Sequence, residues 1–174
     1  MKGLDYVVSK VKEFHLAFAH PVADKPQPLS LERAIKRAVW TGEEALVEFV
    51  HQSSDNEEEF LSAYDKLIEG LEKAKEKSLG MEYPKNDLEK LIGQTDALID
   101  AKYFEAGSFV EMGILPQNMF DSVQDANMAK LGEDGKPILR ESDGKIMKPQ
   151  GWEENYAPEA KIRAEVELQI QNCN

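Results

Sequence analysis

Two short segments of the sequence each carry a pair of carboxylates four residues apart within an apolar stretch. The pairs are Glu44 with Glu48 and Asp96 with Asp100, and in both the order is acid, Ala, Leu, β-branched residue, acid. On a helix, residues four apart lie on one face, one turn above each other. Like charges at that spacing repel, whereas a hard divalent cation such as Mg²⁺ favours oxygen ligands presented together. The two pairs therefore indicate a metal site.

Two other interpretations of these acids remain open. The chain has 33 acidic residues, so a pair at this spacing can also belong to a solvated helix face. That interpretation suits the acids between positions 57 and 76, which alternate with lysines. A di-iron bundle needs Glu-x-x-His on two helices. Glu48 and His51 supply one copy, but Tyr103 stands where the second helix needs its histidine.

The composition restricts the classes of partner. Acids outnumber the 21 bases and give a formal charge of −12, so binding to nucleic acid or to an anionic membrane is not expected. The one cysteine, Cys173, excludes a disulfide framework or a thiolate zinc site within a single chain. No apolar run reaches the length of a membrane span, and no signal peptide is visible. We expect one domain over residues 1–174 and a cytoplasmic location.

Most of the chain is predicted to be helical, because apolar residues recur at steps of three and four. The expected helices cover 6–19, 31–52, 57–77, 87–112, 117–131 and 158–172. Ser30 is the expected N-cap of the second helix, and Ser54 with Glu57 forms an expected capping box for the third. Short strands are expected over 137–140 and 145–148, around a turn at Asp143-Gly144. The predicted fold class is all-α: a bundle of about five to six helices with a small β-hairpin or ordered loop near the C-terminus.

In an all-α chain, the two acidic pairs resemble the all-α nucleotide pyrophosphohydrolase superfamily, the MazG-like proteins, which carries an ExxE and a later ExxD motif. The chain is similar over nearly its whole length to the small stand-alone branch labelled phosphoribosyl-ATP pyrophosphohydrolase-like. The matching stretches are VKEFH (11–15) with HP (20–21), WTGEE (40–44), DALID (96–100), NMAKL (127–131), DGKP (134–137) and a second DGK (143–145). The spacing departs from both motifs, because Ala45 and Ala97 occupy the positions at which the motifs carry their first acidic residue.

The resemblance implies hydrolysis of a nucleoside triphosphate, including modified or deoxy forms, to the monophosphate and pyrophosphate as a cleaning of nucleotide pools. Its cofactor would be Mg²⁺, with Mn²⁺ as an alternative ion. Glu44, Glu48, Asp96 and Asp100 would be the metal ligands, and Glu43 and Glu44 the catalytic carboxylates. A metal is also needed because the sequence contains neither a P-loop nor a G-x-G-x-x-G motif to hold phosphates.

The resemblance also implies substrate contacts from Asn127 and Lys130, and His15 and Trp40 are further candidates for substrate binding. The ordinary alternatives are a lysine that complements a helix C-terminus, a structural histidine and an aromatic side chain packed in the core. The superfamily implies a homodimer or homotetramer. The alternative function is a non-catalytic helical module that binds a divalent ion or a nucleotide for regulation or interaction.

Overall fold

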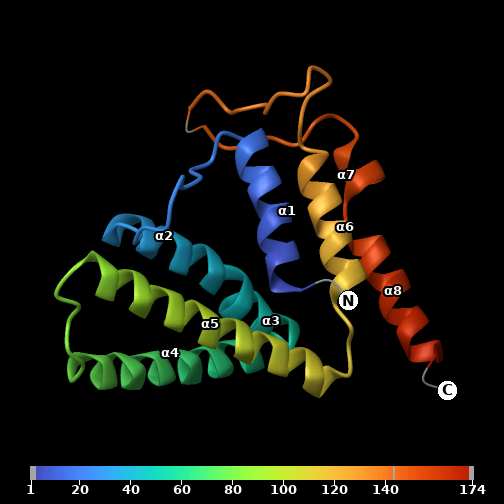
Figure 1. Ribbon diagram of the computed structural model, residues 1–174. Helices are drawn as coiled ribbons and strands as arrows, with labels where there is room; N and C mark the ends of the chain where they lie inside the picture. Colours follow the sequence, from blue (N-terminus) through green and yellow to red (C-terminus); the bar gives the residue numbers. More distant parts are fainter. Residues whose placement is uncertain (1–2, 143, 173–174) are drawn as a thin grey trace. The chain divides into compact units, whose positions relative to one another are not determined.

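The computed structural model describes residues 3–142 and 144–172. Asp143, in the predicted turn, and Cys173 lie outside these ranges. The described elements are α1 (Leu4–Ala17), α2 (Leu31–Gly42), a π-helical segment η1 (Glu43–Glu48), α3 (Phe49–Gln52), α4 (Glu57–Leu79), α5 (Asp87–Met112), α6 (Gln117–Met128), α7 (Trp152–Tyr156) and α8 (Glu159–Asn172) (Figure 1). The prediction of an all-α fold is confirmed.

Capping side chains set where α2 and α4 begin. Ser30 Oγ accepts a hydrogen bond from the backbone N–H of Arg33 at 3.2 Å, as predicted. The prediction for α4 is wrong, because its N-cap is Asn56, whose Oδ1 accepts from the N–H of Glu59 at 3.0 Å. Ser54 Oγ instead donates to the carbonyl of Val50. Asn caps as well as Ser does, so the choice between the two positions depends on the path of the loop.

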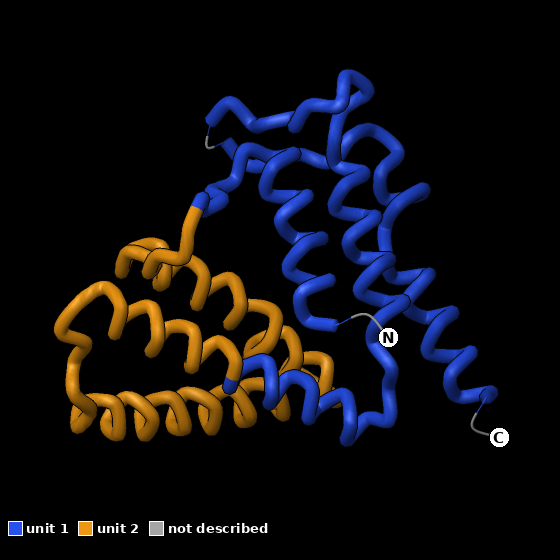
Figure 2. Tube along the Cα trace, in the orientation of Figure 1, with its two compact units in different colours: residues 1–24, 100–174 blue, residues 25–99 orange. Residues whose placement is uncertain are grey.

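The long helix α5 carries the second acidic pair. Asn86 Oδ1 accepts from the N–H of Glu89 at 3.0 Å and caps the helix. Gly113 follows the last residue with a φ of +71°, a left-handed conformation that favours glycine and ends the helix. Two compact units share this helix: one comprises residues 1–24 and 100–174, the other residues 25–99 (Figure 2).

In the first unit, α6 packs between α1 and α8 (Figure 1). Hydrogen bonds join α6 to α1, where Gln124 Nε2 donates to the Lys10 carbonyl at 2.9 Å, and join α8 to the segment before α6, where the side chain of Gln169 pairs with the backbone of Leu115. The apolar residues that are buried in the described ranges all belong to this unit: they are Phe18, Ala126 and Trp152.

The second unit contains α2, η1, α3, α4 and the N-terminal part of α5. The side chain of Gln94 on α5 both donates to and accepts from the backbone of Leu29, at 3.0 and 2.8 Å, which fixes α5 to the segment that leads into α2. His51 on α3 meets the ring of Phe60 on α4 edge to face, at 5.1 Å between ring centroids. Within the described residues, this unit buries no apolar side chain fully.

The segment between α6 and α7 forms an ordered loop, and the hairpin is not confirmed. Its described residues make two isolated antiparallel bridges, Leu131 with Pro137 and Leu139 with Ile146, in place of paired strands. The second bridge falls where the hairpin was expected. No helix in the described part of the chain is long and apolar enough to cross a membrane.

Candidate active site

The first acidic pair lies in the π-helical segment η1, between α2 and α3. The backbone N–H of Phe49 bonds to the carbonyl of Glu44, five residues earlier, which defines the wider π turn. In such a turn the residue five positions along, as well as the one four positions along, lies close above a given residue. Glu44 and Glu48 lie close together in this segment, and Glu43 directly precedes Glu44 in the chain. Short π-helical stretches occur frequently at functional sites.

The electrostatics of the segment agree with this arrangement. Partial burial raises the pKa of Glu44, a hydrogen bond shared with Glu48 and the charge of Glu48 raise it further, and the charge of Glu43 adds to the effect. The side chains of Glu43, Glu44 and Glu48 are all mostly exposed to solvent. The predicted repulsion between Glu44 and Glu48 is thus present in the fold. A cation bound between them would relieve it.

The second pair, Asp96 and Asp100, lies one turn apart on α5, and both side chains are exposed. Within the residues that the structure describes, neither carboxylate forms an ion pair, whereas Glu105, further along α5, pairs with Lys102. In residues 3–142 and 144–172, no three side chains of His, Cys, Asp or Glu lie close enough together to hold a metal ion. That the two acidic pairs bind one metal ion together stays a prediction.

Asn127 and Lys130 are brought together at the C-terminal end of α6. Lys130 Nζ donates to Asn127 Oδ1 at 2.7 Å and lies 5.5 Å from the centre of the Trp152 ring. Burial lowers the pKa of Lys130, the charge of Lys148 lowers it further, and Glu153 opposes both. The lysine is therefore held by side-chain contacts and not by a helix C-terminus alone.

His15 and Trp40 have different surroundings. The Nδ1 atom of His15 lies 2.8 Å from the carbonyl oxygen of Pro21, so the histidine fastens the turn that follows α1. Trp40 is 44% exposed and is not part of a core; the guanidinium groups of Arg33 and Arg37 lie 5.3 and 5.9 Å from its ring centre. A solvent-facing aromatic beside two cations keeps its ring available for stacking. The substrate-binding role of both residues stays a prediction.

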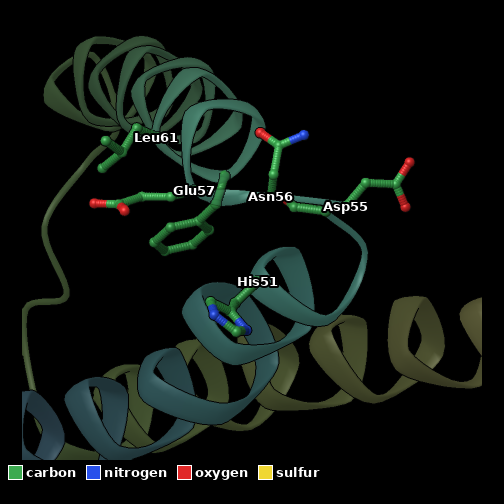
Figure 3. A pocket seen from close by; sticks show the side chains of 7 residues that line it. His51, Asp55, Asn56, Glu57 and Leu61 are labelled. Carbon is green, nitrogen blue, oxygen red and sulfur yellow. The ribbon is translucent and has the colours of Figure 1, made fainter.

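An open hollow of about 460 Å³ lies between α3 and the start of α4 (Figure 3). Its lining residues are His51, Ser54, Asp55, Asn56, Glu57, Phe60 and Leu61. None of the predicted ligands lines it. His51 turns toward Phe60 there, and in the described residues it joins no group of carboxylates of the kind a di-iron centre needs.

Two features of the site were missed by the sequence analysis. The π turn of η1 has no sequence signal, because side-chain periodicity over six residues does not distinguish it from an α turn. The indole of Trp152 packs against the end of α6 from a position 26 residues away, with Nε1 donating to the Ala126 carbonyl at 2.9 Å. The available signal was the presence of a tryptophan shortly after Lys145 and Lys148.

Comparison with known proteins agrees with the fold. The model of the phosphoribosyl-ATP pyrophosphohydrolase family matches residues 11–127. A solved structure from Exiguobacterium sp. 255-15, named as a candidate NTP pyrophosphohydrolase, is 53% identical, with a TM-score of 0.92 over 97% of this chain and 98% of that chain. No curated protein matches this sequence significantly.

The all-α fold and the match to the family model define a pyrophosphohydrolase of the MazG-like class. The chain belongs to the phosphoribosyl-ATP pyrophosphohydrolase family within that superfamily. It is a hydrolase that acts on acid anhydrides.

Proposed function

We propose that the chain hydrolyses a nucleoside triphosphate to the monophosphate and pyrophosphate in a reaction that depends on Mg²⁺, and that it removes modified or deoxy nucleotides from the nucleotide pool. The observation that carries the proposal is the placement of Glu44 and Glu48 beside each other on one π-helical segment, with Glu43 next to Glu44 in the chain. A structural role gains nothing from like charges at this distance, whereas an oxygen-only donor set suits a hard cation.

In this proposal, Glu44, Glu48, Asp96 and Asp100 would hold the ion. Bound Mg²⁺ would neutralise the phosphate oxygens and lower the pKa of water. The carboxylates orient the attacking water toward the α-phosphorus, and Glu43 or Glu44 accepts its proton. The bond between the α-phosphorus and the bridging oxygen then breaks, and the pyrophosphate leaves with the electron pair of that bond. Lys130, positioned by Asn127, supplies positive charge to the phosphate chain.

A homodimer or homotetramer is part of the proposal. In the described residues the fully buried apolar side chains are few, while large apolar side chains on α5 are exposed: Leu98 by 63%, Tyr103 by 79% and Val110 by 79%. A chain of 174 residues normally buries much more of its apolar surface on folding. A second copy of the chain is the partner we expect to cover this helix.

The experiment is a panel of standard, deoxy and damaged nucleoside triphosphates, assayed for pyrophosphate release with and without Mg²⁺. Glu44→Gln and Asp100→Asn should each lower turnover by at least about 100-fold, because each removes one charge that balances the transition state. Glu76→Gln on the exposed face of α4 is the matched control and should keep full activity. Full activity in either site variant, or turnover that ignores divalent ions, would contradict the proposal.

A further inference from the structure

A buried tryptophan forms a fixed platform at the start of α7. Trp152 is 4% exposed, although α7 itself lies at the surface. Its Nε1 donates to the carbonyl of Ala126 at 2.9 Å, so the ring is fixed against the last turn of α6. The family match ends at Asn127, and the platform therefore lies in the part of the chain beyond it.

Two lysines from different segments converge on this ring. Lys148, from the loop before α7, places Nζ 4.1 Å from the ring centre, and Lys130, from the end of α6, places Nζ 5.5 Å from it. Each ammonium group is also held by a polar side chain. Lys148 Nζ bonds to Glu153 Oε1 at 2.6 Å, and Lys130 Nζ donates to Asn127 Oδ1 at 2.7 Å.

The charges at this place do not balance. Two ammonium groups face one carboxylate, that of Glu153, in a chain whose formal charge is −12. Besides burial, the nearby charge of Lys148 lowers the pKa of Lys130, so the two cations are close enough to repel each other. Contact with the indole compensates for part of that repulsion and desolvation. The cluster of Lys130, Lys148 and Glu153 therefore keeps a net positive charge, although the chain as a whole is acidic.

We infer that Lys130 and Lys148, held on the Trp152 ring, form a binding site for a phosphate chain. The inference deepens the proposed function, on which it rests for the source of the anion. Each ammonium group has three N–H donors, and the Asn127 Nδ2 atom is a further donor that the bond to Lys130 does not use. A pyrophosphate or triphosphate group offers several charged oxygens in a row, which two separately anchored cations can engage at once. Lys148 is thus a second substrate-positioning residue.

The test is direct binding of sodium pyrophosphate in EDTA at constant ionic strength, which excludes any contribution from a metal ion. In a Trp40→Phe background Trp152 is the sole tryptophan, and its fluorescence reports on the site. We expect a saturable change in emission, and about tenfold or weaker binding in Lys148→Met. Lys161→Met, at an exposed lysine on α8, is the control and should bind like the parent.

A second variant has the opposite expected sign. Glu153→Gln keeps both lysines and removes the carboxylate that competes for Lys148, so it should bind pyrophosphate as tightly as the parent or more tightly. A melting curve would reveal whether Lys148→Met folds. If it does not fold, pyrophosphate binding by Glu153→Gln still tests the anion site. Unchanged binding in Lys148→Met, weaker binding in Glu153→Gln, or an emission change that follows ionic strength alone would overturn the inference.

The two proposals fail separately. Pyrophosphate binding that depends on Lys148, in a protein that releases pyrophosphate from no nucleotide, would contradict the proposed function and leave the anion site in place. Normal Mg²⁺-dependent turnover, together with pyrophosphate binding that is indifferent to Lys148, would contradict the anion site alone.

Discussion

Replacing Glu48 by glutamine should make the metal-free protein more stable at neutral pH. Glu48 shares a hydrogen bond with Glu44 and, after burial, is the main cause of the raised pKa of Glu44. The amide keeps the shape of the side chain, removes its charge and can donate a hydrogen bond to the Glu44 carboxylate. The ionised form of Glu44 therefore becomes less costly in the folded protein.

The expected size follows from the like-charge pair that is removed. Glu48 lies beside Glu44 in η1, and a like-charge pair one turn apart on an exposed helix costs about 0.2–0.5 kcal/mol. In a domain of this size 1 kcal/mol corresponds to about 2–4 °C, so the melting temperature should rise by about 0.5–2 °C.

The sign of the effect depends on pH. A carboxyl group whose pKa is raised in the folded state favours folding most when it is protonated, below its unfolded pKa, and loses that contribution as the pH rises through its folded pKa. For Glu44 this contribution is therefore largest in acid and decreases as the pH rises. The gain from Glu48→Gln should therefore be present at pH 7 and vanish when the pH falls below the pKa of Glu44.

Thermal unfolding in EDTA, followed by circular dichroism at several pH values, measures this effect. Glu76→Gln is the control, because Glu76 lies four residues after Glu72 on exposed α4, and Glu72 is already paired with Lys75. Its melting temperature should change less than that of Glu48→Gln. A Glu48→Gln protein that melts at or below the wild-type temperature at pH 7, or a gain that persists at acidic pH, would refute the reasoning.

Further predictions concern the metal, the assembly and a helix cap. Mg²⁺ or Mn²⁺ at a hundred times Kd should stabilise the protein by about 2.7 kcal/mol, more than NaCl of equal ionic strength, and Asp96→Asn should abolish most of that rise in melting temperature. Equal effects of both salts would contradict a carboxylate metal site. Light scattering at micromolar concentration should show a dimer or tetramer, whereas a 19.6 kDa species alone would exclude one. Ser30→Ala removes the bond to the Arg33 N–H and should cost about 1 kcal/mol, or 2–4 °C of melting temperature; an unchanged value would show that the cap is dispensable.

Much of this protein could be predicted from local sequence. The six expected helices follow from apolar residues at steps of three and four, and their bounds agree with the observed ones within a few residues, whereas the short helix α7 was not predicted. The carboxylates of Glu44 and Glu48 lie on neighbouring turns because spacing along a helix depends only on its period. Even the place of the second antiparallel bridge, Leu139 with Ile146, agrees with the expected turn.

Tertiary structure decided the features that involve backbone register or distant segments. The π turn is defined by the bond from the Phe49 N–H to the Glu44 carbonyl, which side-chain periodicity does not encode. The lysine pair depends on Trp152 packing against Ala126, a contact across 26 residues. Lys148 is unremarkable in sequence, because a surface lysine and a platform lysine differ only in what the folded chain places beside them. Local spacing thus determines which side chains share a helix face, whereas long-range packing determines which faces meet.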